Sequence, residues 1–242
     1  YTYDLWKESI FTFEQVQDQL ISGKSSDPDK DGFSNFLEYA FGGRALVKDN
    51  NLNPSAKIII KDVGINPTRA ALINVLKEMG GYIELTEAKK VSNEAVCNIL
   101  VKHSQLKGAD IGGEIIPSLI DEIPILSIAA SFADGKSTIS DIGELRVKES
   151  DRLNAISQGL NAIGIANVTS ETSITVHGKA GYIEQTDNIE SFGDHRIAMS
   201  FLVAGLKSKQ GITVNNCRNI VTSYPNFVSD MNQLGCKISE VK

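Results

Sequence analysis

The chain has 242 residues, a hydrophobic content of 41% and a formal net charge of −6 at pH 7, which are typical of a globular protein with a sizeable core. The negative charge argues against general binding to nucleic acids or anionic membranes, because neither would be attracted to an acidic surface. No apolar run approaches the roughly 18 residues that a transmembrane helix needs. We therefore expect a cytoplasmic protein, and its widely spaced cysteines, Cys97, Cys217 and Cys236, indicate reduced thiols.

An acidic motif, DPDKDGFSNFLE, stands near the start of the chain at residues 27–38. It fits the pattern of a calcium loop, in which hard oxygen ligands surround the ion and a Gly at the sixth position allows a sharp turn. Helix-like segments flank it, so residues 1–50 are predicted to form a small helical segment with an EF-hand-like or dockerin-like loop. The alternative is an Asp-rich turn that binds no metal. The expected Ca²⁺ ligands are the side chains of Asp27, Asp29, Asp31, Asn35 and Glu38 and the backbone carbonyl of Phe33.

Residues 48–55 are polar and turn-forming, and beyond this predicted linker β-branched runs alternate with amphipathic helices. The alternation is an internal repeat. One unit is a helix, then Gly, then a strand, with Gly80, Gly164 and Gly235 where a helix C-terminus favours a positive φ. This unit occupies residues 68–85, 151–170 and 226–239.

A second unit, at 122–142 and 194–216, consists of a buried helix rich in small residues, a Gly turn and a β-branched strand. Of an earlier copy only the strand at 57–64 is present. The order of the units predicts an α/β domain over residues 56–242, a three-fold pseudo-repeat whose first repeat is incomplete. Because the helices of the second unit have almost no polar face, we expect helices packed inside and sheets outside them. Further strands are expected at 81–84, 98–104, 172–178 and 181–187.

The segment ELRVKESDRLNAI, residues 144–156, carries far more charge than a connection between a strand and a helix needs. Ser150 or Asp151 could cap the helix that begins here, and carboxylates near its start suit the helix dipole. A capped helix start with solvated ion pairs is therefore one interpretation. It does not account for Lys148 and Arg152, which stand four residues apart.

The other interpretation of this segment is a binding site for an anion. Arg152 offers a planar fork that suits carboxylate or phosphate, and Lys148 offers a point charge. Glu149, between them, would be a poised acid or base.

Two further motifs place charged side chains at the start of a buried helix. In SFGDHRIAMS the helix begins with Asp194, His195 and Arg196. An arginine at a helix N-terminus favours an anion site, whereas a lone histidine is more often structural. In PSLIDEIPILSIAA, Asp121 either caps the helix or is a carboxylate that can take or give a proton. The arginines and carboxylates together predict a substrate with carboxylate and phosphate groups, and proton transfer that needs no metal.

The same motifs carry a resemblance to a known family. The chain resembles the C-terminal half of the EPSP synthases, or 3-phosphoshikimate 1-carboxyvinyltransferases, at LRVKESDRL (145–153), DHRIAMS (194–200), IDEIPILSIAA (120–130) and GINPTR (64–69). The family fold is a pair of inside-out, barrel-like α/β domains, each a pseudo-three-fold repeat. Its members transfer the enolpyruvyl group of phosphoenolpyruvate to the 5-hydroxyl of shikimate 3-phosphate in aromatic amino acid biosynthesis. A related enolpyruvyl transferase that acts on a UDP-sugar shares the fold, but RVKESDR favours the shikimate enzyme.

The resemblance implies a role for each candidate residue and no cofactor for the chemistry. Asp121 would be the base toward the 5-hydroxyl, and Glu149 would give or take a proton at the enolpyruvyl carbon. Two arginines would grip phosphoenolpyruvate, a lysine would contact the shikimate ligand, and a histidine would line the pocket. These substrate-binding residues would be Lys148, Arg152, His195 and Arg196.

The resemblance does not extend to the family's N-terminal domain, which supplies a catalytic lysine and much of the shikimate 3-phosphate site. We therefore expect little or no transferase activity from this chain unless a complementing N-terminal domain joins it. The alternative, from another class of protein, is a non-catalytic calcium-binding or interaction module built on a transferase-derived half.

Overall fold

The structure is a computed structural model that describes residues 57–241 except 180, 185–186, 209 and 235. The predicted helical segment and calcium loop of residues 1–50 lie outside the described residues, as does Gly235. The chain divides into two compact units that are described separately. The larger comprises residues 61–99 and 104–225, and the smaller includes 57–60, 100–103 and 226–241.

The first repeat unit forms a helix, a Gly turn and a strand, as predicted. Helix α5 (Ala71–Glu78) buries Ala71 and Val75, which recur at helical spacing. The helix ends at Glu78, and the chain turns at Gly80, whose φ is +98°, so that the Gly81 N–H donates to the Leu76 carbonyl. The chain then enters β2 (Tyr82–Val91), which pairs with β3 (Glu94–Lys102) in a three-stranded sheet of order β1-β3-β2, where β1 is Lys57–Gly64.

The helices of the three predicted helix–Gly–strand segments are each followed by the same kind of backbone hydrogen bond. In α7 (Arg152–Ala162) the chain turns at Gly164, and the Ile165 N–H donates to the Leu160 carbonyl at 2.9 Å. In α10 (Phe227–Gln233), within the smaller unit, the Cys236 N–H donates to the Met231 carbonyl at 3.1 Å. Each bond satisfies a carbonyl that the end of a helix would otherwise leave unpaired.

The predicted second units also form, and their helices are buried. In α6 (Ile123–Ser131) the hydroxyls of Ser127 and Ser131 donate to carbonyls one turn back, at 2.8 and 2.7 Å, so the helix can lie in the core without unpaired side chains. It leads through Gly135 into β5 (Lys136–Ile139). The corresponding copy is α8 (His195–Ala204), a 3-10 turn at Gly205–Lys207, and β9 (Val214–Asn215).

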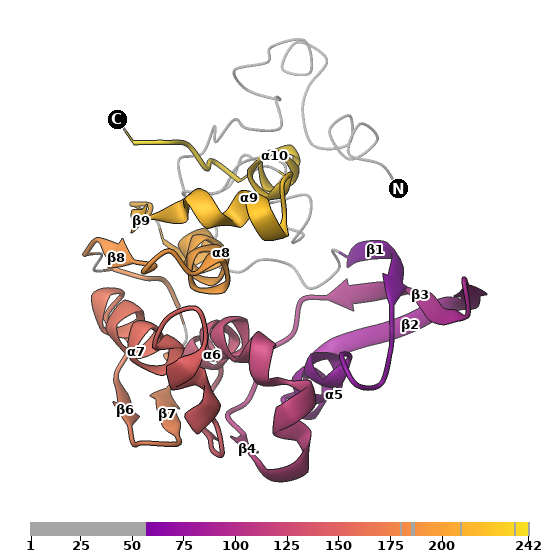
Figure 1. Cartoon of the computed structure of the whole chain (residues 1–242), viewed down its shortest axis with the longest axis horizontal. Helices are drawn as coiled ribbons and strands as arrows, with labels where there is room; N and C mark the ends of the chain where they lie inside the picture. Colours follow the sequence, from indigo (N-terminus) through magenta and orange to yellow (C-terminus); the bar gives the residue numbers. More distant parts are fainter. Residues whose placement is uncertain (1–56, 180, 185–186, 209, 235, 242) are drawn as a thin grey trace. The chain divides into compact units, whose positions relative to one another are not determined.

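Helices α6, α7 and α8 contact one another in the larger unit, beside a four-stranded sheet (Figure 1). The sheet has the order β4-β5-β7-β6, in which β4 is parallel to β5 and the other pairs are antiparallel. A close approach between α7 and α8 occurs at Gly159, where a Cβ atom would stand only 2.2 Å from the ring of Phe201. The remaining strands are β4 (Asp110–Ile111), β6 (Asn167–Thr169), β7 (Ile174–His177) and β8 (Ile189–Glu190), which pairs with β9.

Short helical turns make up most of the remaining connections. They position the loops before α6 and α7 and carry residues that the next subsection describes. Their bounds are Gly113–Ser118, Ile120–Glu122, Gly143–Val147 and Cys217–Asn219 for the 3-10 turns and Ile220–Ser223 for α9.

Two predicted strands do not form. In the described part of 181–187 only Ile183 makes a bridge, with Ser208. After α10, residues 236–241 adopt no strand, because the side chain of Asn232 holds both backbone groups of Ile238: its oxygen accepts from the N–H at 2.8 Å and its amide donates to the carbonyl at 2.9 Å. Those backbone groups are then not available for a strand partner.

Two other expectations concern chemistry and membranes. The three cysteines are free thiols, as predicted. In the part of the chain that the structure describes, no helix is both long enough and apolar enough to cross a membrane.

Candidate active site

The site is built around Arg152, the first residue of α7. The helix begins here because Asp151 caps it, with its carboxylate accepting from the Asn154 N–H at 3.0 Å. Of the two caps that the sequence allows, the structure uses Asp151. Ser150 instead turns its hydroxyl to Asp194, at 3.2 Å.

The guanidinium of Arg152 is buried, with a side chain that is 1% exposed, and it reaches three carboxylates. Nε donates to Asp194 Oδ2 at 2.7 Å, and Nη1 donates to Asp121 Oδ1 at 3.1 Å. Nη2 donates to Glu149 Oε2. A charge taken out of water is tolerated only with such pairing, because an uncompensated ion in the interior costs several kcal/mol.

Asp194 is a fixed counter-ion of Arg152. Burial opposes the negative charge of Asp194, but the hydrogen bond and charge of Arg152 and the N–H groups of Arg196 and Ile197 outweigh it and lower the pKa of the carboxyl group. Burial likewise opposes the charge of Arg152, and Asp194, followed by Glu149 and Asp121, keeps the pKa of the guanidinium above its ordinary value. Both groups are therefore charged at neutral pH.

Arg196, the second residue of α8, stands on the other side of Asp121. Its Nη1 donates to the Asp121 carbonyl at 2.8 Å and to Glu122 Oε1 at 3.1 Å, and its Nη2 lies 3.6 Å from Asp121 Oδ2. The carboxylate of Asp121 thus lies between the two arginines. The Arg196 side chain is 25% exposed, so it is the more accessible of the two.

The structure brings together four of the six residues predicted to be catalytic or substrate-binding. Asp121, Glu149, Arg152 and Arg196 form one connected cluster. Lys148 pairs instead with Glu144, one turn back in sequence. His195 is the first residue of α8 and is half-buried, and within the described residues its side chain makes no hydrogen bond or ion pair.

Two residues of the cluster were not predicted as site residues, Asp194 and Glu122. Asp194 had a visible signal, since an Asp directly before an apolar helix is a preferred cap. Its side-chain oxygen Oδ1 accepts from the N–H groups of Arg196 and Ile197, at 2.9 and 3.4 Å. No local pattern indicates that its other oxygen reaches Arg152, 42 residues away in sequence.

The arginines and accessible carboxylates of the cluster are groups that can bind an anion and transfer protons. The side chains of Asp121 and Glu149 are 39% and 53% exposed, so a ligand can reach them and could replace them on the arginine. Where the structure describes the chain, no group of three or more His, Cys, Asp or Glu side chains is arranged to hold a metal ion.

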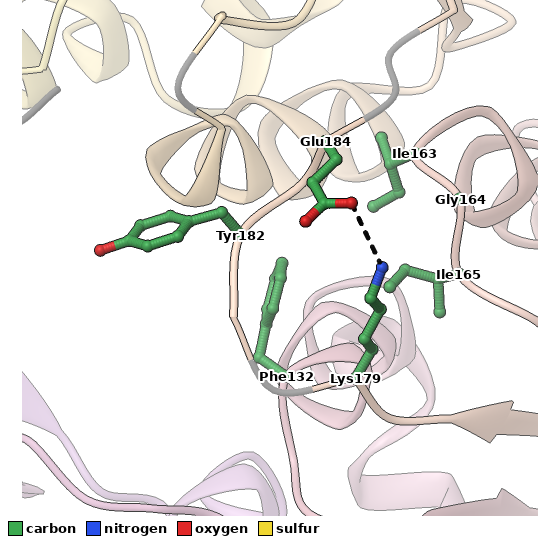
Figure 2. A pocket seen from close by; sticks show the side chains of 7 residues that line it. All are labelled: Phe132, Ile163, Gly164, Ile165, Lys179, Tyr182 and Glu184. Atoms are coloured by element: carbon green, nitrogen blue, oxygen red, sulfur yellow. Dashed lines mark ion pairs between the residues drawn. The ribbon is translucent and has the colours of Figure 1, made fainter. Parts of the chain in front are cut away.

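A pocket of about 110 Å³ elsewhere in the larger unit does not involve this cluster (Figure 2). Its one ion pair joins Lys179 and Glu184, at 3.9 Å, and both side chains are exposed. None of the predicted site residues lines it. Its lining consists of Phe132, Ile163, Gly164, Ile165, Lys179, Tyr182 and Glu184.

Comparisons of the sequence with known proteins identify a family that the chain matches. The sequence profile of the family described as EPSP synthase (3-phosphoshikimate 1-carboxyvinyltransferase) matches residues 51–231. The 3-phosphoshikimate 1-carboxyvinyltransferase of Geotalea daltonii is 47% identical over 178 residues, which are 73% of this chain and 41% of that protein. That of Zymomonas mobilis is 45% identical over 196 residues, or 79% of this chain and 43% of the relative.

Solved structures give the same result. EPSP synthase from Acinetobacter baumannii superposes with a TM-score of 0.75 and 34% identity, over 90% of this chain and 47% of that one. The enolpyruvyl transferase NikO from Streptomyces tendae, at 20% identity and a TM-score of 0.58 over 78% of this chain, shares the fold. The chain spans less than half the length of each of these relatives. The extent of the profile match and the identities show that this chain belongs to the EPSP synthase family.

Proposed function

We propose that the chain supplies one half of an active site that transfers the enolpyruvyl group of phosphoenolpyruvate to shikimate 3-phosphate, with release of phosphate. The observation that carries the proposal is that Asp121 forms ion pairs with both Arg152 and Arg196, in a chain that belongs to this family. Phosphoenolpyruvate bears a carboxylate and a phosphate, and the planar guanidinium groups of Arg152 and Arg196 suit both. The proposal places the enzyme in the cytoplasm, with residues 56–242 as an inside-out, pseudo-three-fold domain.

In the structure the arginines of the cluster pair with its own carboxylates. The first step of the proposed reaction is therefore the exchange of these carboxylates for the ligand. The Nη atoms of Arg152 are held by the accessible carboxylates of Asp121 and Glu149. Anionic groups of phosphoenolpyruvate would replace these carboxylates on the arginine. The exchange keeps the guanidinium neutralised, and it frees both carboxylates to face the reacting atoms.

The chemistry requires three proton transfers at the reacting atoms, and Asp121 and Glu149 are proposed to perform them. Asp121 would accept the proton of the 5-hydroxyl as the hydroxyl oxygen bonds to C2 of phosphoenolpyruvate. Glu149, which takes up a proton from solvent once it has left Arg152, would give that proton to the methylene carbon C3. Glu149 would then take a proton back from C3 as the bond from C2 to the phosphate oxygen breaks. The enolpyruvyl double bond is restored, and the leaving phosphate takes the proton that Asp121 held.

Two further residues are proposed to contact the substrates. Lys148 would bind the shikimate ligand, and for this it must exchange its present partner Glu144 for an anionic group of that ligand. His195, next to Arg196 at the start of α8, would line the same site.

A complementing N-terminal domain is the proposed partner, since the chain spans less than half the length of its relatives. We expect no phosphate release from this chain with both substrates, and turnover when it is mixed with the N-terminal half of a relative such as the Geotalea daltonii enzyme. The measurement is a coupled phosphate-release assay. Robust turnover by the chain alone would contradict the half-site proposal. A mixture of two folded halves that stays inactive would contradict the transferase function.

A further inference from the structure

Asp194 differs from the other carboxylates of the Arg152 cluster in its burial. Its side chain is 0% exposed, against 39% for Asp121 and 53% for Glu149. A ligand that enters the site can therefore compete with Asp121 and Glu149 for Arg152, but it cannot reach Asp194. Of the three carboxylates, Asp194 alone is a permanent partner.

The two oxygens of Asp194 hold different helices. Oδ1 accepts from the N–H of Arg196 and so begins α8. Oδ2 accepts from Nε of Arg152, at the start of α7, and from the hydroxyl of Ser150. One carboxylate therefore fixes the starts of both helices that carry the arginines. The bond to Nε also leaves Nη1 and Nη2, the two-pronged edge of the guanidinium, directed at the accessible carboxylates.

We propose that Asp194 is a positioning residue for anion binding: it holds Arg152 by Nε so that Nη1 and Nη2 are presented to the ligand. The proposal rests on the proposed function, in which phosphoenolpyruvate is that ligand. It assigns to Asp194 an effect on substrate affinity that acts through Arg152, without contact between Asp194 and the substrate.

The chain contains a matched control for the simpler view that Asp194 only caps a helix. Asp151 is also an aspartate at a helix start, and it also pairs with an arginine, Arg146, at 3.0 Å. That pair is exposed, and the side chain of Asp151 does not contact the side chain of Arg152. Asparagine is as good a cap as aspartate, so D194N and D151N both retain a cap oxygen and lose the charge and the second acceptor oxygen that pairs with the arginine.

The test is the affinity of the full chain for phosphoenolpyruvate, measured by calorimetry in wild type, D194N and D151N, and again in an R152K background. We expect D194N to weaken binding at least about tenfold, as expected for loss of a charge-assisted hydrogen bond, and D151N to change it by less than about twofold. In the R152K background D194N should have less than about a twofold effect, because the residue it acts through is gone. Affinity unchanged by D194N, or an equal loss in both backgrounds, would overturn the proposal.

A second measurement separates this proposal from the proposed function. Nuclear magnetic resonance of the Arg152 Nε–H should show slow hydrogen exchange in wild type and D151N and fast exchange in D194N. If wild type binds no phosphoenolpyruvate, the proposed function fails. If D194N leaves the hydrogen exchange of the Arg152 Nε–H unchanged, the positioning role is overturned, whether or not phosphoenolpyruvate binds. If D194N does not fold, S150A, which removes the hydroxyl that donates to the same oxygen, takes its place in the cycle, with an expected loss of about threefold.

Discussion

Replacing Arg152 by methionine is expected to lower the free energy of unfolding by about 3–5 kcal/mol. The substitution keeps an unbranched apolar stem but removes the guanidinium, so it leaves Asp194 in the interior without its cation. The remaining partners of Asp194, two backbone N–H groups and the Ser150 hydroxyl, do not supply a full opposite charge. Urea denaturation of the full chain, followed by circular dichroism, measures the effect.

The control for this prediction is R146M. Arg146 also forms an ion pair with an aspartate that caps a helix, but both side chains are more than a third exposed to solvent, at 35% and 40%. We expect R146M to cost no more than about 1–2 kcal/mol, including its two hydrogen bonds to backbone carbonyls. The double variant R152M/D194N should be more stable than R152M, because it removes the unpaired charge. An R152M variant as stable as R146M would show that the buried ion pair does not hold this part of the fold together.

The largest expected effect on activity is that of E149Q. In a mixture with a complementing N-terminal domain, this variant should lower kcat for phosphate release by about 10²–10⁴-fold, because an amide cannot give or take the proton at C3. Glu149 is half-exposed and its replacement is nearly isosteric, so the fold should persist. Steady-state phosphate release at saturating concentrations of both substrates is the measurement.

The matched variant is E144Q. Glu144 lies five residues earlier, is 62% exposed and also pairs with a basic side chain, Lys148, but it does not contact Arg152. We expect its kcat to stay within about threefold of wild type, as for the loss of a surface ion pair. If E149Q kept kcat within that same range, Glu149 would not be the proton carrier.

Local sequence patterns predicted the repeat units well because the signals act over a few residues. The turns at Gly80 and Gly164 need only a residue that tolerates positive φ after an amphipathic helix, and both formed with the expected hydrogen bonds. The buried helix of residues 123–131 followed from its lack of a polar face. Strands were less predictable, since a strand needs a partner that the local sequence does not specify. The segment 181–187 contains β-forming residues, yet in its described part only Ile183 makes a bridge.

The site was predictable in its residue types and not in its connections. The arginine fork, the acidic neighbours and their places at helix starts could be recognised from the motifs. The three-way pairing of Arg152 could not be recognised, because two of its partners are distant in sequence. Asp121 is 31 residues away and Asp194 is 42 residues away. The pair of Lys148 and Glu144 is local, four residues apart, but the sequence is equally compatible with a Lys148 that faces the cluster. Calcium binding at residues 27–38 stays a prediction, since that loop lies outside the described residues.

The central claim is that the two arginines exchange their own carboxylates for the anionic groups of phosphoenolpyruvate. Nitrogen-15 spectra of the guanidinium groups of Arg152 and Arg196, recorded while phosphoenolpyruvate is titrated into the full chain, test it most directly. We predict that both signals shift and saturate with the same dissociation constant, because one ligand binds between them. Phosphoenolpyruvate that binds and leaves both guanidinium signals unchanged, or that does not bind at all, would contradict the account.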